Sequence, residues 1–319
     1  MENAAPKPAI EAATDSFHQM KWRDGKKLSV PFVLSQRKNR NATVHFFPQN
    51  CGNPIFAKNN VMMDFIDTHS HLYAEEFDND RAEAISRCFE AGVNRLILPD
   101  IDATSRQAML DMAASDPKHF FPCAGLHPTS VDGDYKAGLK QVETMLASGQ
   151  RFYAVGEIGI DLYWDQTFER EQFDAFATQV RWAKELGLPI IVHIRNAIEK
   201  TIAALDPLVD DRLSGVFHCF SGTLEQAQKA ISMGFMLGIG GVLTYKKSEL
   251  PSIVGQIDIQ HLLLETDCPY LAPVPHRGKR NESSYIPLIA QKMAEIKGVD
   301  IEAVAEQTTR NAELLFGLP

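Results

Sequence analysis

Apolar residues gather into short runs that alternate with longer amphipathic stretches from residue 65 onward. Each run is apolar along nearly its whole length, which is typical of strands buried on both faces of a parallel sheet. Because amphipathic stretches separate the runs, the pattern predicts alternating strands and helices. The eight predicted strands are residues 65–72, 95–101, 121–128, 152–161, 188–196, 214–222, 234–244 and 261–271.

Two of the intervening stretches carry clear helix signals. Residues 167–189 place Phe173, Phe176 and Val180 on one helical face, followed by a stop at Gly187. Because the apolar positions recur at helical spacing up to that glycine, this stretch predicts one long amphipathic helix.

The stretch at residues 221–234 offers Thr223 as an N-cap, Gln226 three residues later and Gly234 as a stop. Eight strand–helix units in about 255 residues match the size of a (β/α)8 TIM barrel. The sequence does not repeat with a period of 20–50 residues, which argues against a solenoid. The predicted fold class is therefore α/β, with a TIM barrel.

Residues 1–62 differ from the rest of the chain. They are rich in Ala, Pro, Asn and basic residues and show neither helical nor strand periodicity. We expect a peripheral or poorly ordered N-terminal extension at 1–62, followed by a barrel domain at 63–319. Met62 and Met63 directly precede the first strand, so either is a candidate for the native start, which would make the extension non-native.

Charge is distributed unevenly along the chain. Residues 1–62 carry nine Lys/Arg and four Asp/Glu, whereas the remaining 257 residues carry 23 basic and 37 acidic residues. The net charge of −9 argues against coating nucleic acid with a broad basic surface. Any phosphate bound by this acidic body therefore needs a local source of positive charge.

Composition is that of a globular protein with a substantial core, at 45% hydrophobic and 23% charged residues. Apolar runs fall short of the roughly 18 residues of a membrane span, and the amino terminus lacks a signal-peptide core. The five cysteines form no C-x-x-C pair, which indicates reduced thiols. We expect a soluble, cytoplasmic protein with no membrane association and no obligate protein partner.

The first predicted strand reads FIDTHSHLY and carries a polar residue at every second position. Since successive side chains of a strand point to opposite faces, Asp67, His69 and His71 are predicted to share one face. Ile66 and Leu72 would then face the helices. Asp67 lies lower on the polar face, so we expect it to orient a ligand imidazole.

Further ionisable residues follow apolar runs at the carboxyl ends of the other predicted strands. In a barrel these positions point inward at the end where active sites form. Burying them together is costly unless they are paired or bind metal. A lone histidine is more often a hydrogen-bonded structural residue, but six such groups on five strands favour a metal site. The six candidate ligands are His69, His71, Glu157, His193, His218 and Asp267.

The number of ligands also limits the kind of site. Four histidines and two carboxylates exceed what one tetrahedral zinc ion requires. Two divalent ions bridged by a carboxylate fit better, and such pairs typically lie about 3.5–4 Å apart and lower the pKa of a bound water toward about 7. Hydrolysis therefore follows more naturally than redox chemistry. Histidine-rich ligation suits Zn²⁺, Mn²⁺ or Co²⁺ better than Mg²⁺.

Seven motifs occur in order along the chain: FIDTHSHLY, GLHP, VGEIGID, PIIVHIRNA, FHCFSG, ETDCPYLAP and RGKRNE. Together they resemble the TatD-type metal-dependent deoxyribonucleases, a family of amidohydrolase-like TIM-barrel hydrolases. The resemblance runs from about residue 65 to the carboxyl end and leaves residues 1–62 uncovered. The family is usually described as Mg²⁺-dependent, so the resemblance and the ligand chemistry disagree on the activating ion.

The resemblance implies a division of the ligands between two ions. Glu157 would bridge them, and Asp267 would also orient the attacking water and accept its proton. The first ion would have His69, His71, Glu157 and Asp267 as ligands, and the second Glu157, His193 and His218.

The resemblance also implies substrate contacts. His127 matches the family's substrate-facing histidine, and Arg277 and Arg280 match its phosphate-binding loop, together with Asn281 and Glu282. Arg195 points to the same mouth if strand alternation persists past His193. Without the resemblance, we would interpret the arginines as a solvated surface loop. The family's usual proline after RNE is Ser283 here, so we expect a less fixed loop backbone.

The leading hypothesis is a metal-dependent deoxyribonuclease that cleaves DNA phosphodiesters from a 3′ end, with DNA as a transient partner. The alternative is an amide or ester hydrolase with the same metal constellation, such as a D-aminoacyl-tRNA deacylase or a cyclic amidase, because arginine also binds carboxylates well. A third hypothesis is a non-catalytic adaptor that recruits nucleic acid through its basic amino-terminal segment.

Overall fold

The computed structural model describes residues 63–319, so the predicted extension at 1–62 lies outside the described residues. Eight parallel strands alternate with helices, as the apolar pattern predicts. Each strand overlaps one predicted run but most are shorter, because the runs continue into the loops. The strands are β1 (Phe65–Asp67), β2 (Val93–Leu98), β3 (Phe120–Pro122), β4 (Val155–Asp161), β5 (Ile190–Arg195), β6 (Gly215–Phe217), β7 (Phe235–Ile239) and β8 (Leu262–Leu264).

The helices begin and end at the signals present in the sequence. Thr223 and Gln226 form the expected capping box at the start of α6, and Gly187 ends α4 in the left-handed conformation at φ 66°. No helix in the described part of the chain is long and apolar enough to cross a membrane. The helices are α1 (Arg81–Glu90), α2 (Arg106–Ser115), α3 (Tyr135–Leu146), α4 (Glu169–Leu186), α5 (Ile198–Leu205), α6 (Leu224–Ser232), α7 (Leu250–Gln256), α8 (Ile286–Lys297) and α9 (Ile301–Phe316).

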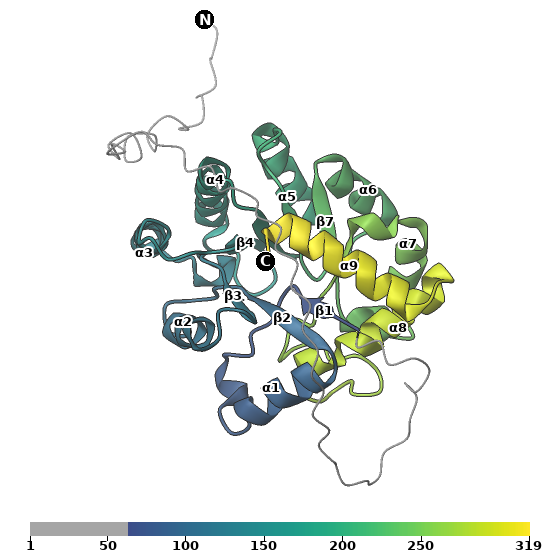
Figure 1. Ribbon diagram of the computed structural model, residues 1–319. Helices are drawn as coiled ribbons and strands as arrows, with labels where there is room; N and C mark the ends of the chain where they lie inside the picture. Colours follow the sequence, from purple (N-terminus) through teal and green to yellow (C-terminus); the bar gives the residue numbers. More distant parts are fainter. Residues whose placement is uncertain (1–62) are drawn as a thin grey trace, which may run out of the picture. The chain divides into compact units, whose positions relative to one another are not determined.

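The strands close into a barrel through two seams. Strands β1–β3 form one parallel sheet and β4–β8 form another. One seam is the parallel bridge between Ala124 and Val155, and the other is the bridge between Ser70 and Cys268. The helices surround the strands (Figure 1). The predicted (β/α)8 architecture is therefore confirmed.

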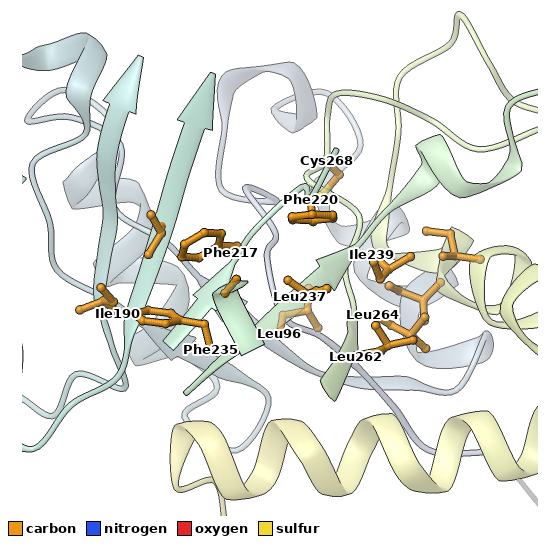
Figure 2. Packing of buried hydrophobic residues seen from close by; sticks show 14 of the residues in the cluster. Leu96, Ile190, Phe217, Phe220, Phe235, Leu237, Ile239, Leu262, Leu264 and Cys268 are labelled. Carbon is orange, nitrogen blue, oxygen red and sulfur yellow. The ribbon is translucent and has the colours of Figure 1, made fainter. Parts of the chain in front are cut away.

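The core has an outer and an inner cluster of apolar side chains. The outer cluster packs between strands and helices, and it includes Phe217 and Phe235, whose ring centres lie 5.1 Å apart (Figure 2). The inner cluster takes alternate residues from most strands, since neighbouring side chains of a strand face opposite sides. Its members on the strands include Ile66, Ile97, Phe121, Ile191, Val216 and Leu263.

Helix α9 covers the amino-terminal end of the barrel. Its residues Ala312 and Phe316 belong to the inner cluster. The Thr309 hydroxyl donates to the carbonyl of Asp64, and the Asn311 amide donates to the carbonyl of Leu262. Both carbonyls lie at the beginning of a strand, so the carboxyl-terminal end of the barrel is left for a functional site.

The predicted alternation along FIDTHSHLY is wrong at Ile66. This residue packs in the inner cluster, whereas Leu72 packs in the outer cluster as predicted. The reason is that β1 ends at Asp67, so its two-residue periodicity does not continue to the histidines.

Candidate metal centre

The candidate ligands all lie at the carboxyl-terminal end of the barrel. Glu157 and His193 belong to β4 and β5, while the others follow directly after β1, β6 and β8. The structure brings them together in three groups, within each of which the ligand atoms lie within 4.8 Å of one another. These groups are His69, Glu157 and His218; His69, His71 and Asp267; and His127, Glu157 and His193.

The two carboxylate oxygens of Glu157 face different pairs of histidines. Oε2 lies 3.1 Å from His69 Nε2 and 3.7 Å from His71 Nε2. Oε1 lies 2.7 Å from His193 Nδ1 and 2.8 Å from His218 Nε2. Asp267 joins the first pair, with Oδ1 3.8 Å from His69 Nε2 and 3.7 Å from His71 Nε2. Glu157 therefore stands between two groups of donor atoms.

Hydrogen bonds on the far side of two rings fix which nitrogen faces the centre. His71 Nδ1 lies 2.9 Å from the hydroxyl of Tyr73, which donates its proton to the carbonyl of Pro99. His193 Nε2 lies 2.9 Å from Asp161 Oδ2. The far nitrogen of His71 therefore carries the ring proton and its Nε2 keeps its lone pair, whereas both nitrogens of His193 face carboxylate oxygens. Such outer contacts are what orient histidines that bind metal.

Imidazole nitrogens and carboxylate oxygens thus gather around one position. The closest pair is His193 Nδ1 and Glu157 Oε1, at 2.7 Å. A pair this close needs a cation between its two atoms, either a proton or a metal ion. The donor set of imidazole nitrogens and carboxylate oxygens therefore fits a divalent metal ion.

Burial and the mutual proximity of these groups set their pKa values. Burial lowers the pKa of His69 to about 4 and that of His71 well below its ordinary value. Burial opposes ionisation of Glu157, but the surrounding histidines, His218 foremost, hold its pKa well below the usual range. Burial opposes protonation of His193 and His218 as well, but hydrogen bonds to Asp161 and Glu157 raise the pKa of His193, and the charge of Glu157 raises the pKa of His218 well above its ordinary value. The centre therefore has a charged Glu157 beside two neutral rings and two rings that favour a proton, and a bound cation would replace those protons.

His127 differs from His71 because its inward-facing nitrogen carries a proton. Its Nδ1 accepts a hydrogen bond from the backbone N–H of Thr129 at 3.2 Å, as the N-cap of the short helix η3 (Pro128–Ser130). In the neutral ring Nε2 is therefore protonated, and it lies 3.2 Å from His193 Nδ1. His127 presents a donor to the centre rather than a lone pair.

Glu265 was missed by sequence reasoning. Its buried carboxylate accepts from the backbone N–H of Cys219 at 2.5 Å, and its Oε1 lies 3.7 Å from His218 Nδ1. Its Oε2 has no hydrogen-bond partner among the described residues. A Cβ at Gly238 would fall 2.0 Å from that oxygen, so this glycine makes the space that Glu265 occupies. A glycine inside β7 was the available signal.

Asp67 does not contact an imidazole in the described structure, which differs from the prediction. Its Oδ1 accepts from the backbone N–H groups of His69 and Thr266, at 3.2 and 2.9 Å, and its Oδ2 accepts from the Thr266 hydroxyl. It therefore connects the backbone after β1 to the backbone after β8. The influence of Asp67 on His69 runs through the main chain.

The structure also gives Arg280 a role that differs from the predicted phosphate contact. Its two terminal nitrogens lie 2.6 and 2.7 Å from the oxygens of Asp80, the N-cap of α1. Beside it, Glu282 accepts two hydrogen bonds from Arg87 at 2.9 and 2.7 Å. We call these four residues the charged clasp. The clasp joins the loop after β8 to α1, so its charges are already paired.

The other residues predicted at the substrate mouth, Asn281, Arg277 and Arg195, have either a structural role or a free charge. The buried Asn281 amide donates to the carbonyls of Thr266 and Tyr270, which is a structural role. In contrast, Arg277 packs over the ring of Tyr245 at 4.5 Å, and Arg195 packs over the ring of Tyr163 at 4.0 Å. Cation–π contacts of this kind leave N–H donors available to a ligand.

A parallel barrel whose carboxyl-terminal end gathers imidazoles around a buried carboxylate defines the class of metal-dependent hydrolases. The chain belongs to the family described as TatD related DNase, whose model matches residues 66–317. The expected family and enzyme class are therefore confirmed.

Relatives of known sequence and structure cover the whole barrel. The uncharacterized metal-dependent hydrolase YabD of Bacillus subtilis is 36% identical over 251 residues, covering 78% of this chain and 98% of its own. The 3′-5′ ssDNA/RNA exonuclease TatD of Escherichia fergusonii is 34% identical over 254 residues, covering 78% and 97%. The crystal structure of YjjV, a TatD homologue from Escherichia coli, matches with a TM-score of 0.76 and 29% identity, covering 81% and 100%.

Proposed function

We propose that this protein is a deoxyribonuclease that hydrolyses phosphodiester bonds of DNA from the 3′ end, with divalent metal ions as cofactors. The observation that carries the proposal is the position of Glu157, whose two oxygens each face a different pair of histidines. This arrangement supports a carboxylate that bridges two ions. The name of the Escherichia fergusonii relative, a 3′-5′ ssDNA/RNA exonuclease, supports the substrate and polarity.

The proposed ligands form two groups, one beside each carboxylate oxygen of Glu157. One ion would have His69, His71, Glu157 and Asp267, and the other Glu157, His193 and His218. Bound there, divalent ions supply the positive charge and Lewis acidity that phosphodiester hydrolysis needs. Since four of the six proposed ligands are histidines, we propose Zn²⁺, Mn²⁺ or Co²⁺ as the tightly held ion, with Mg²⁺ as the competing candidate for activation.

Other side chains handle the proton and the substrate. Asp267 is proposed to orient the attacking water and to accept its proton. His127 is proposed to donate its Nε2 proton to a non-bridging oxygen of the phosphate, because its Nδ1 is already an acceptor for Thr129. Arg277 and Arg195 are proposed to contribute positive charge to an otherwise acidic body.

A cavity of about 450 Å³ opens beside His218, between the ends of β5 and β6. This volume lies in the range of typical ligand pockets, about 300–1,000 Å³. Its lining combines polar residues with apolar ones such as Ile198 and Phe220, which supports occupancy by a group with both characters, such as a nucleotide. Residues of the lining include Asn196, Lys200, Ser221, Gly222 and Thr223.

One assay panel on protein of measured metal content tests the proposal. The substrates are 3′-labelled single-stranded and double-stranded DNA, a D-aminoacyl-tRNA and a cyclic amide. We expect stepwise shortening of DNA from the 3′ end, abolished by a chelator and restored by a divalent metal. Turnover of only the aminoacyl ester or the cyclic amide would overturn the nuclease assignment and support the alternative hydrolase.

A further inference from the structure

Two aromatic side chains stand exposed directly after β4, although most large apolar side chains of the barrel are buried. Tyr163 is 52% exposed and Trp164 is 68% exposed. Their ring centres lie 4.9 Å apart with the planes at 85°. Arg195, at the end of β5, places its Cζ 4.0 Å from the centre of the Tyr163 ring and 5.0 Å from that of Trp164. We call these three residues the aromatic–arginine patch.

A single buried carboxylate connects this patch to the candidate metal centre. Asp161 Oδ1 accepts from the backbone N–H groups of Tyr163 and Trp164, at 2.9 and 3.2 Å. Its other oxygen, Oδ2, accepts from His193 Nε2 at 2.9 Å. The backbone that carries the aromatic rings and the imidazole that faces Glu157 are thus fixed by the same side chain. The patch therefore adjoins the position proposed for the scissile phosphate.

We propose that the aromatic–arginine patch stacks against an unpaired nucleobase of single-stranded DNA whose terminal phosphodiester lies at the metal centre. The proposal rests on the proposed function and adds a base-binding subsite for the single-stranded substrate that is named for the Escherichia fergusonii relative. Exposed aromatic rings bind bases through their π faces, and a neighbouring arginine adds cation–π attraction and a charge for the backbone. In a duplex the bases are stacked and paired, so their faces are not available.

The overall charge explains why such a patch is needed. With a net charge of −9, the protein gains little non-specific attraction for DNA from its surface as a whole. Base stacking is far less dependent on charge, and it tolerates any sequence because every base has a π face. The patch thus supplies affinity that does not depend on which base is bound.

The test is a double-mutant cycle between the protein and the DNA. The probes are a fluorescent single-stranded oligothymidylate and the same strand with abasic residues at its three 3′-terminal positions, both with phosphorothioate linkages that slow cleavage. Fluorescence anisotropy with metal-loaded protein gives the dissociation constants. We expect Trp164→Ala to weaken binding of the intact strand by about tenfold, within the range for loss of one stacked base. The abasic strand should bind wild type and Trp164→Ala equally.

Two controls make the outcome specific. Trp164→Phe keeps an aromatic face and should retain most of the affinity. Leu314→Ala removes an equally exposed apolar side chain, 72% exposed on α9 at the opposite end of the barrel, and should bind both strands as wild type does. Equal weakening of both strands by Trp164→Ala, or no weakening, would overturn the proposal.

The experiments distinguish failure of the proposed function from failure of the aromatic–arginine patch. If no DNA is cleaved but Trp164 and the terminal bases are coupled in binding, the nuclease assignment fails and the patch remains. If DNA is cleaved and the coupling is absent, only the patch is wrong.

Discussion

The metal centre and the charged clasp are two groups of ionisable residues at the same end of the barrel, and they resolve their charges in opposite ways. In the clasp, Arg87 pairs with Glu282 and Arg280 pairs with Asp80, each through two hydrogen bonds. At the centre, histidine nitrogens face the carboxylate of Glu157. An arginine stays charged and keeps its carboxylate paired, whereas an imidazole can exchange its proton for a metal ion.

Replacing the central carboxylate should have the largest effect. Glu157→Gln keeps the volume but removes the charge between the two pairs of histidines. We expect DNA cleavage to fall by about a thousandfold, the upper end for loss of one electrostatic group, and bound metal to be lost. Metal analysis and cleavage rates measure this, with circular dichroism to show that the fold is retained. Near-wild-type activity of a metal-replete preparation would refute the bridging role.

Replacing a residue that orients a metal ligand should lower metal binding less than replacing the ligand itself. Glu265→Gln removes the charge facing His218 Nδ1, so metal affinity should fall by about 10–100-fold, as outer contacts of metal ligands usually require. Competition with a chromophoric chelator measures the affinity. The matched control is Glu302→Gln, an exposed substitution on α9. Equal affinities of the two variants would mean that Glu265 does not position the imidazole.

The two arginines of the loop after β8 should separate binding from stability. Arg277→Ala should raise the KM for a DNA oligonucleotide about fivefold, which corresponds to about 1 kcal/mol for an exposed charged contact. Arg280→Ala should leave KM unchanged and lower the melting temperature by about 2–4 °C, because it removes both hydrogen bonds from Arg280 to Asp80. The reverse assignment of the two effects would show that the clasp binds substrate.

The pH dependence of the clasp should give the smallest effect. Hydrogen bonds from Arg280 and Arg87 hold the pKa of Asp80 well below its usual 3.8. A carboxyl group whose pKa is lower in the folded state stabilises the fold at pH values above its unfolded-state pKa. This contribution to stability is lost as the pH falls. The difference in melting temperature between wild type and Asp80→Asn should therefore be constant from pH 7 to 5 and shrink below about pH 4. A difference that grows on acidification would contradict this.

The fold and the convergence of the candidate ligands were readable from the sequence for one physical reason. Apolar runs mark buried parallel strands, and the polar residues after Phe217 or Leu264 must then meet at one end of a barrel. The order of the strands around the barrel was also predictable, since the strands of a TIM barrel follow their order along the chain.

The roles that depend on a specific partner could not be predicted. Arg280 follows the family motif, but its pairing with Asp80 joins residues 200 positions apart. Glu265 acts on a ring from another strand, so nothing beside it in the sequence indicates its role. Asp67 contacts the backbone of His69 rather than its ring for a local reason, because β1 ends at Asp67 and the alternation stops there.

The ligands of the metal centre come from both sheets of the barrel, on either side of its two seams. His69 and His71 follow a strand of the β1–β3 sheet, whereas Glu157 and Asp267 belong with the β4–β8 sheet. Between the sheets, the bridges at Ala124–Val155 and Ser70–Cys268 are supported by backbone hydrogen bonds, such as those from Asp267 N–H to the carbonyl of His69 and from Gly156 N–H to the carbonyl of Ala124. An ion bound by His69, His71, Glu157 and Asp267 would therefore link the two sheets and stabilise the contact between them. Hydrogen exchange of the amides at both seams would then report occupancy of the centre without any substrate.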